Sequence, residues 1–482
     1  MSELSEVAAR MWSVLDGPMD ALERLTTVGS RRVLPSVYDV TGLATGAVAA
    51  ASLAVAELAA VRSACAPPRV TVDSRAACAA FSSERLLEAV GWELPPIWDP
   101  IAGDYRASDR WIRLHTNYRA HRLAALKALQ LPGDPDRDTV AARVAERTAD
   151  DVEQAVVDNG GCAAAYNDRD LWRVHPHGSA TAGEPPIVIG TAPAGVAVDL
   201  PAPDPLRPLA GVRVLDLTRV IAGPVCTRFL AAYGAEVLRI DPPGFEEVPA
   251  LVPDTSVGKR CTALDLGDAR DRSEFERLVG QAHVVVHGLR PGAMERLGLG
   301  PDVLRELNPQ VLTARHNAYG WTGPWSERRG FDSLVQMSCG IAAAGAEATG
   351  ADRPVPLPAQ ALDHATGYLV AAALVRGLAG GGPVDVTASL LGTANVLMAM
   401  PDPDGMTIEP PAWTSADTVE QRTEWGPARI VPCPGEVTGR PVRWDVPPGP
   451  LGRHDARWPA AVRSTAPPTR AGRAVDRSLK QG

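Results

Sequence analysis

Apolar positions over residues 209–400 follow two alternating spacings. Short runs such as "GVRVLDL", "AEVLRID", "HVVVHGL" and "QVLTARHNA" are rich in branched apolar residues and predict buried strands. The runs between them, "PVCTRFLAAYG", "DRSEFERLVGQ" and "DVLRELN", place apolar residues at helical spacing. Strands and helices that alternate in this way predict an α/β fold with a doubly wound parallel sheet, a Rossmann-like large domain.

The first 173 residues show a different pattern. Residues 44–62, "ATGAVAAASLAVAELAAVR", predict a helix that is apolar on nearly every side and is therefore expected to be buried. Residues 103–118 alternate around a Ser-Asp turn and predict two strands, and helices are expected after them over about 119–130 and 138–157. These elements predict a smaller α+β domain over about residues 95–160.

Prolines and glycines mark the remaining boundaries. Residues 174–208 are rich in Pro, Gly and Ala and predict a linker. Residues 401–460 are proline-rich, with short strands expected in "ARIVPC" and "RPVRWDV", and predict a C-terminal segment that returns to the large domain. Residues 461–482 are expected to be a disordered tail.

The chain contains a weak internal repeat. "ATGAVAAASLAVAEL" at 44–58 resembles "ATGYLVAAALVRGL" at 365–378, and a Val-Asp pair follows each segment. In the N-terminal copy, Gly42 stands where the C-terminal copy has Asp363, and Leu43 stands where it has His364. A helix that is apolar on all sides needs a partner, so we expect the two helices to pack together.

The composition narrows the range of functions. The 482-residue chain is 45% hydrophobic and 22% charged, and its net charge of −9 argues against binding to nucleic acid or to a membrane surface. The seven cysteines have neither C-x-x-C nor Cys/His spacing, so no metal site is expected. The sequence shows no signal peptide and no apolar run long enough to span a membrane, and we expect a cytoplasmic protein.

Loops at the carboxyl ends of the strands are the places to look for a ligand site in such a sheet. Ala222 and Gly223 open a predicted helix whose free N–H groups suit a phosphate. The loop before them lacks G-x-G-x-x-G, which weakens a dinucleotide interpretation.

Basic residues near these loops point to the same kind of ligand. Lys259, one of only three lysines in the chain, stands beside Arg260 between a loop and a short strand. Arg290 and Arg296 flank a Pro-Gly turn that opens a helix. Guanidinium groups suit phosphate contacts and adenine stacking, so these residues predict a phosphate-bearing ligand.

Several segments in a fixed order resemble the class III CoA-transferases, the family that includes carnitine and formyl CoA-transferases and α-methylacyl-CoA racemase. They are "LAGVRVLDLTRVIAGPVCTRFLAAYGAEVLRIDPP", "VGKRCTALDL", "VVVHGLRPGAMERLGLG", "LNPQVLTARHNAYGWTGPW", "GFDSLVQMSCGIAAAG" and "ALDHATGYLVAAAL". The first 173 residues resemble the second half of a family member, placed before a first half.

The resemblance implies a CoA-transferase of the interlocked fold type, with coenzyme A as a substrate moiety and no bound cofactor. Its partners would be an acyl-CoA and a carboxylic acid, and two chains would form a homodimer. The implied CoA contacts are Ala222, Gly223, Lys259, Arg260, Leu289, Arg290, Arg296 and Tyr319. Pro242 stands where some members carry a further CoA-binding arginine.

Two aspartates are candidates for the chemistry that the resemblance implies, in which a carboxylate attacks the thioester and forms first an anhydride and then an aspartyl-CoA. Asp352 lies in the glycine-containing loop "TGADRPVP", eleven residues before Asp363, and is the predicted nucleophile; it could instead be a turn residue. Asp332, in "GFD", is the alternative acid/base group. Asp363 is expected to cap its helix, and His316 to be a structural hydrogen-bond partner.

Two other functions stay open. An acyl-CoA racemase or isomerase would exchange the α-proton of an acyl-CoA with no acceptor acid. A non-catalytic CoA-binding or scaffold subunit is the other alternative, because the two halves are in reversed order and the segment after residue 400 holds no second obvious small domain.

Overall fold

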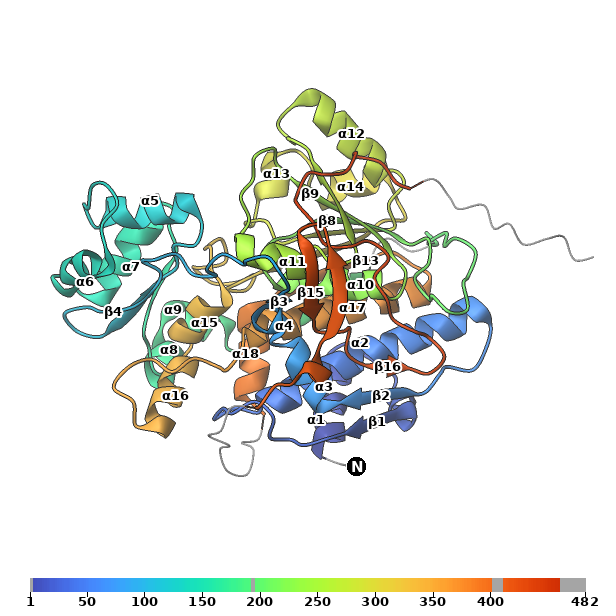
Figure 1. Ribbon diagram of the computed structural model, residues 1–482, viewed down its shortest axis with the longest axis horizontal. Coiled ribbons are helices and arrows are strands. Elements are labelled where there is room, and N and C mark those ends of the chain that lie inside the picture. Colours follow the sequence, from blue (N-terminus) through green and yellow to red (C-terminus); the bar gives the residue numbers. More distant parts are fainter. Residues whose placement is uncertain (1–2, 192–195, 401–410, 460–482) are drawn as a thin grey trace, which may run out of the picture.

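A seven-stranded sheet lies at the centre of the structure, a computed structural model that describes residues 3–191, 196–400 and 411–459 (Figure 1). The strand order is β10-β9-β8-β11-β12-β13-β7, and all neighbours are parallel except β7, which runs antiparallel to β13. The strands are β7 Ile187–Thr191, β8 Arg213–Leu217, β9 Glu236–Asp241, β10 Lys259–Ala263, β11 Val284–His287, β12 Leu312–Asn317 and β13 Val384–Ser389. The predicted parallel α/β sheet is confirmed.

Helices cover both faces of this sheet. On one face, Phe275 of α12 and Leu304 of α14 share an apolar core with Leu215 and Leu238 of the sheet. On the other face, α10 and α17 pack against the branched residues of the strands. The helices are α10 Ala222–Ala232, α12 Ala269–Val279, α13 Ala293–Arg296, α14 Pro301–Leu307 and α17 Ala361–Gly380. The sheet is therefore doubly wound, as the alternating pattern predicts; the interlocking of two chains stays a prediction.

The buried apolar helix expected near residues 44–62 is α2, Val40–Ser63. It packs against α17, and α1 (Glu3–Ser13) and α3 (Ser74–Ala80) cover other parts of its surface. Among the described helices, α2 alone is long and apolar enough to cross a membrane, but most of it is buried inside the protein. The predicted packing of α2 on α17 is confirmed.

The C-terminal segment binds back onto the N-terminal region. β16 pairs with β2 in the sheet β1-β2-β16, and the hairpin of β14 and β15 adds β3. Trp458 packs into the apolar core beneath α12, within the segment predicted to return to the large domain. The run "RPVRWDV" forms no strand, and the predicted tail 461–482 lies outside the described residues. The elements are η1 Met19–Arg24, β1 Leu25–Val28, β2 Val70–Asp73, α4 Ser83–Leu86, β3 Glu88–Ala89, η3 Ser415–Asp417, β14 Val419–Thr423, β15 Gly426–Ile430 and β16 Glu436–Val437.

The small domain forms a lobe beside the main body, at the left of Figure 1. A three-stranded antiparallel sheet and three helices enclose their own apolar core. The elements are β4 Gly103–Arg106, β5 Trp111–Leu114, α5 Arg119–Ala128, α6 Arg137–Ala145, α7 Ala149–Asp158 and β6 Ala163–Ala165. The single helix expected at 138–157 is wrong: Thr148 accepts a hydrogen bond from the Asp151 N–H and begins a separate helix, α7.

The segment predicted as a linker, 174–208, contains ordered elements. Its run "IVIGT" is β7, the antiparallel edge of the main sheet, and α9 precedes it. The strand depends on pairing with β13, a contact across almost 200 residues that local composition does not reveal. The remaining elements are α8 Arg169–Val174, α9 Pro176–Thr181, η2 Pro249–Leu251, α11 Val252–Thr255, α15 Asp332–Ser338, α16 Ile341–Thr349 and α18 Leu390–Met398.

Candidate active site

A cavity of about 480 Å³, here called the arginine cavity, opens at the carboxyl edge of the parallel sheet. Its walls come from the loops after β8, β11 and β12, from α17 and from the start of α5 in the small lobe. Residues that line it include Tyr118, His121, Val220, Ala222, Leu289, Arg290, Arg296, His316, Arg328, Arg329, Phe331 and Asp363. Both halves of the chain therefore build one cavity, at the edge where α/β sheets bind ligands.

Positive charge is concentrated in this cavity. Arg328 already has partners inside the protein. Its Nη2 lies 2.8 Å from Glu153 Oε1, and its guanidinium lies over the ring of Trp325. Arg290, Arg296 and Arg329 form no ion pair with any residue that the structure describes. Partial burial, and then the charges of Arg329 and Arg296, lower the pKa of Arg290. Such a cluster fits a ligand with several negative charges.

The second candidate catalytic residue of the sequence, Asp332, is completely buried and caps α17. Its Oδ2 accepts hydrogen bonds from the N–H groups of Leu362 at 2.9 Å and Asp363 at 3.0 Å, and Gln336 donates to its Oδ1. Burial raises the pKa of Asp332 to about 6. All of these contacts are structural, so Asp332 stabilises the first turn of α17 from outside the helix.

Asp363, in that first turn, has a different environment. Its carboxyl accepts no hydrogen bond from the described residues, and it lines both the arginine cavity and a second cavity. Burial, and then the nearby carboxylates of Asp332 and Glu84, raise the pKa of Asp363 well above its usual value. The expectation that Asp363 caps its helix is therefore wrong: Asp332 caps α17, and the Asp363 carboxyl faces the cavities.

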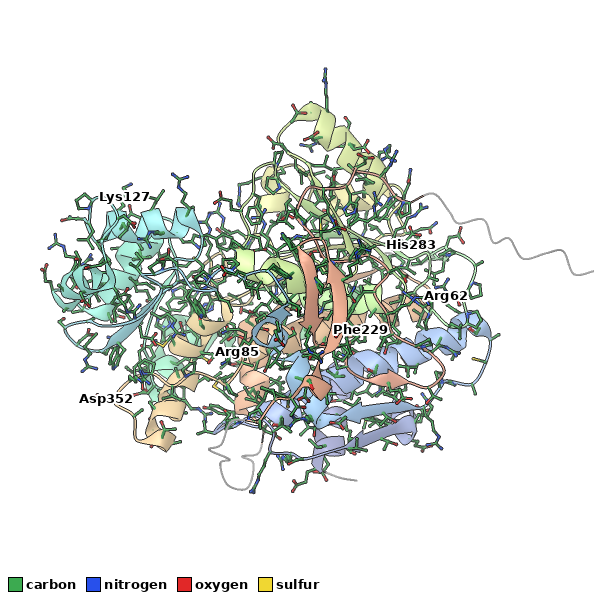
Figure 2. All side chains as sticks on the ribbon, in the orientation of Figure 1. Arg62, Arg85, Lys127, Phe229, His283 and Asp352 are labelled. Carbon is green, nitrogen blue, oxygen red and sulfur yellow. The ribbon has the colours of Figure 1, made fainter. Side chains whose placement is uncertain are left out.

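Asp352, the nucleophile that the sequence favoured, lies elsewhere. Its side chain is exposed on the turn after α16, at the outer edge of the molecule in Figure 2. It lines neither cavity, and its backbone carbonyl accepts a hydrogen bond from Trp111 Nε1 at 2.8 Å. Its position does not support a catalytic role.

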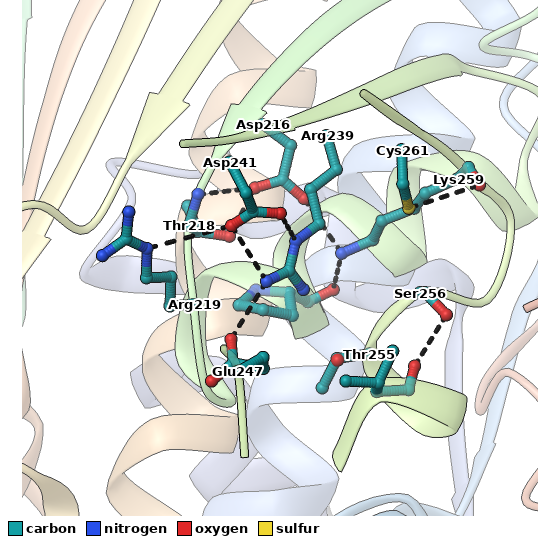
Figure 3. A network of polar contacts seen from close by, with 12 residues as sticks. Asp216, Thr218, Arg219, Arg239, Asp241, Glu247, Thr255, Ser256, Lys259 and Cys261 are labelled. Atoms are coloured by element: carbon teal, nitrogen blue, oxygen red, sulfur yellow. Dashed lines mark hydrogen bonds and ion pairs between the residues drawn. The ribbon is translucent and has the colours of Figure 1, made fainter. Parts of the chain in front are cut away.

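Lys259 occupies a buried ion network rather than the cavity wall (Figure 3). Its Nζ lies 2.9 Å from Asp216 Oδ2 and donates to the carbonyl of Pro224 at 3.1 Å. Although burial opposes the charged form, Lys259 and Arg239 hold the pKa of Asp216 below its usual value. Lys259 thus fixes the first turn of α10, and a direct phosphate contact does not agree with its complete burial.

The other predicted CoA contacts divide into two groups. Ala222, Leu289, Arg290 and Arg296 line the arginine cavity. Gly223, Arg260 and Tyr319 do not: Gly223 packs on Thr218, and the buried Tyr319 hydroxyl lies 3.2 Å from Ser338 Oγ.

The loop after β8 has a strained backbone that the sequence does not reveal. Val220 has a φ of +62°, which is rare for a residue branched at Cβ and costs about 1–3 kcal/mol. Glu247 holds the loop: its Oε2 accepts from the Val220 N–H at 3.1 Å and from Arg239 Nη2 at 3.0 Å, and Tyr118 donates to Oε1. Val220 lines both cavities, so Glu247 fixes a wall of the site.

The second cavity, here called the apolar cavity, has a volume of about 330 Å³ and shares Val220, Phe331 and Asp363 with the arginine cavity. Glu84 of α4 contributes a carboxylate to it and lies 3.1 Å from His364 Nε2. Sequence reasoning missed Glu84 and Glu247, because each is one acidic residue in an ordinary segment, and only the fold buries it.

Comparisons with known proteins find sequence similarity to CoA-transferases. Residues 209–433 match the family model of CoA-transferase family III. The chain is 39% identical over 178 residues to an acetyl-coenzyme A transferase of Hypoxylon pulicicidum, which covers 36% of this chain and 30% of that protein. It is 35% identical over 192 residues to a probable fatty acyl-CoA transferase of Mycobacterium tuberculosis, covering 37% of this chain and 48% of that protein.

A solved structure of the same mycobacterial protein is 35% identical, with a TM-score of 0.37, and the match covers 40% of this chain and 56% of that chain. The chain thus matches 30% and 48% of the length of the two relatives named above.

Proposed function

Because residues 209–433 belong to CoA-transferase family III, we propose that this protein transfers coenzyme A from an acyl-CoA thioester to a carboxylic acid. The position of Asp363 carries the proposal. It is a buried carboxyl that accepts no hydrogen bond from the described residues. It lies between the apolar cavity and a cavity whose Arg290, Arg296 and Arg329 form no ion pair with a described residue. A carboxylate with few partners is a stronger nucleophile than one held by several donors.

Coenzyme A binding is assigned to the arginine cavity. Arg290 and Arg296 contact phosphate oxygens, and the first N–H groups of α10, which have no side-chain cap, add donors near Ala222. The thioester then lies beside Asp363, and the acyl group extends into the apolar cavity.

The reaction uses one carboxylate in four steps. Because its pKa is raised, the Asp363 carboxyl first loses a proton to the solvent. The resulting carboxylate attacks the thioester carbonyl, the C–S bond breaks, and a mixed anhydride and the CoA thiolate form. The thiolate attacks the aspartyl carbonyl, which releases the donor acid and leaves an aspartyl-CoA thioester. The acceptor carboxylate displaces the thiolate and forms a second anhydride. The thiolate attacks the acceptor carbonyl of this anhydride, giving the new acyl-CoA and free Asp363.

Trapping the intermediate tests this function. The purified chain is mixed with an acyl-CoA and hydroxylamine, digested, and the peptides are weighed by mass spectrometry. Hydroxylamine converts an activated aspartyl group to a hydroxamate, and we expect this mass change on the peptide with Asp363 and not on the peptide with Asp352. The absence of both the adduct and CoA transfer would contradict the proposal.

The alternatives have less support. A racemase that uses Asp332 as an acid/base group needs that carboxyl to reach the substrate, but it is buried beneath three hydrogen bonds. A scaffold subunit does not require a cavity with a free carboxyl.

We also propose a homodimer, on the family resemblance, with a complete cavity in each chain. Light scattering of the purified protein is expected to give about twice the chain mass.

A further inference from the structure

The two cavities that meet at Asp363 differ in chemistry. The arginine cavity holds three arginines that form no ion pair with a described residue, whereas most of the residues that line the apolar cavity are apolar, with paired or exposed arginines among them. Side chains from both halves of the chain form these walls, among them Ile97, Trp98, Val248, Leu251, Phe331 and Leu357. An apolar cavity next to a reactive carboxyl fits the part of a substrate that carries no charge.

Stacked rings form one wall of the apolar cavity. The ring of His115 lies flat on Phe331, with 3.7 Å between the ring centroids, and Trp98 and His115 form a T-shaped pair with 6.0 Å between their centroids. Burial lowers the pKa of His115 to about 3, so its ring is neutral at physiological pH. Trp98 is 48% exposed, which leaves a large apolar surface at the mouth for a ligand to cover.

The charged groups of this cavity do not favour an anion. Arg113 donates to both oxygens of Asp104, at 2.7 and 2.9 Å. Arg85 is exposed, and its guanidinium donates to the carbonyl of Pro358, so an anion beside it would remain in water. Glu84 adds a carboxylate to the wall, and a second carboxylate placed near it would be repelled.

We propose, on the basis of the transferase function proposed above, that the apolar cavity selects an uncharged acyl group of intermediate length and excludes acyl groups that end in a carboxylate. A small group such as water occupies roughly 30 Å³ in a liquid. The apolar cavity, at about 330 Å³, therefore has room for about ten groups of this size. Acyl chains of about six to ten carbons fill it, while shorter chains leave part of the apolar wall exposed to water.

The acyl-group preference of the cavity is tested by binding measurements on a variant that lacks the Asp363 carboxyl. Asp363→Asn protein is titrated by calorimetry with CoA, butyryl-CoA, octanoyl-CoA and succinyl-CoA. We expect octanoyl-CoA to bind about tenfold or more tightly than CoA, butyryl-CoA to lie between them, and succinyl-CoA to gain nothing over CoA. Equal affinities, or a gain for succinyl-CoA, would overturn the selection.

Cavity variants locate the effect. Ile97 is half-buried in a loop and lines the apolar cavity, so Ile97→Trp should narrow it. We expect this variant to bind octanoyl-CoA about tenfold more weakly and CoA with unchanged affinity. Leu206→Trp adds the same bulk at an exposed site outside the cavity and is the matched control. If Ile97→Trp does not fold, Trp98→Ala removes part of the stacked wall. Octanoyl-CoA binding that is unchanged in the folded variant would place the acyl group elsewhere.

The two proposals fail in different ways. If no acyl-CoA donor supports transfer but octanoyl-CoA binds as expected, the transferase function is wrong and the acyl selection holds. If transfer proceeds with succinyl-CoA and that ligand also binds most tightly, the selection is wrong and the transferase function holds.

Discussion

The buried helices α2 and α17 are similar, but the carboxylates that cap their N-termini come from different parts of the chain. Asp39 caps α2 locally: its Oδ1 accepts the Gly42 N–H at 2.7 Å, and Arg31 pairs with its other oxygen at 2.9 Å. The cap of α17 comes from Asp332, far earlier in the chain, so Asp363 in the first turn keeps a free carboxyl. A remote cap leaves the helix start open for chemistry, whereas a local cap fills it.

Gly42, which stands where α17 has Asp363, leaves room for the local cap of α2. A Cβ at this position would lie 2.3 Å from the Asp39 carboxylate, so the local cap occupies the space that a side chain would need. The N-terminal helix therefore retains the packing of its counterpart but has no counterpart of Asp363. The five predictions that follow test this contrast, from the largest expected effect to the smallest.

Asp363→Asn is expected to lower kcat for CoA transfer at least about 10³-fold, because the amide does not form the anhydride. Asp352→Asn is the matched control and is expected to keep kcat within about threefold, since it lies outside both cavities. A steady-state assay with saturating acyl-CoA measures both. Loss of activity in the Asp352 variant alone would reverse the assignment.

Asp332→Ala removes the remote cap. Two N–H groups of α17 and the Gln336 amide lose their acceptor in a buried site, and we expect the free energy of unfolding to fall by about 2–4 kcal/mol. Urea denaturation followed by circular dichroism measures the change. A loss of activity with unchanged stability would instead make Asp332 a catalytic group.

The free energy of unfolding is expected to depend on pH through the Asp332 carboxyl. The pKa of Asp332 is raised to about 6 in the folded state, so the fold binds its proton more tightly than the unfolded chain does. Its stabilising contribution is present below the unfolded pKa of about 4 and is lost as the pH rises towards 6. Relative to Asp332→Asn, the wild-type protein is expected to lose up to about 2 kcal/mol over this range. Parallel urea titrations at several pH values show whether it does.

Glu247→Gln loosens the strained loop that faces α17. The amide replaces a carboxylate that accepts from Val220, Arg239 and Tyr118. We expect kcat to fall about tenfold while KM for acyl-CoA changes less than about threefold, because the arginines proposed to bind the phosphates are not altered. Glu247→Asp keeps the charge and should restore part of kcat. Equal changes in KM and kcat, with a lowered melting temperature, would point to general unfolding.

Asp39→Ala tests the local cap of α2. The helix loses its N-cap, and the free energy of unfolding is expected to fall by about 1 kcal/mol, with kcat unchanged. Denaturation and the transfer assay, run on the same preparation, give both values. A fall in kcat comparable to that of the Asp363 variant would show that the N-terminal helix start also takes part in the reaction.

Local patterns in the sequence determined most of the fold. The spacing of apolar residues predicts the parallel sheet, the helices on both its faces and the buried pair of α2 and α17, because these signals repeat within a few residues. The loop motifs also bring four of the predicted residues to one cavity, since Ala222, Leu289, Arg290 and Arg296 line the arginine cavity. Strand β7 was missed because its pairing partner is distant in the chain.

Only the tertiary structure decided which acidic residue faces the cavities without a hydrogen-bond donor among the described residues. An aspartate in the first turn of a helix normally predicts a local contact. In α17 the cap instead comes from Asp332, about thirty residues earlier, and the Asp363 carboxyl accepts no hydrogen bond from the described residues. The fold likewise buries Lys259 against Asp216 and brings Glu247 to Tyr118 of the small lobe. Burial and long-range pairing set the charge and reach of these side chains, and both arise from contacts that short-range sequence patterns do not contain.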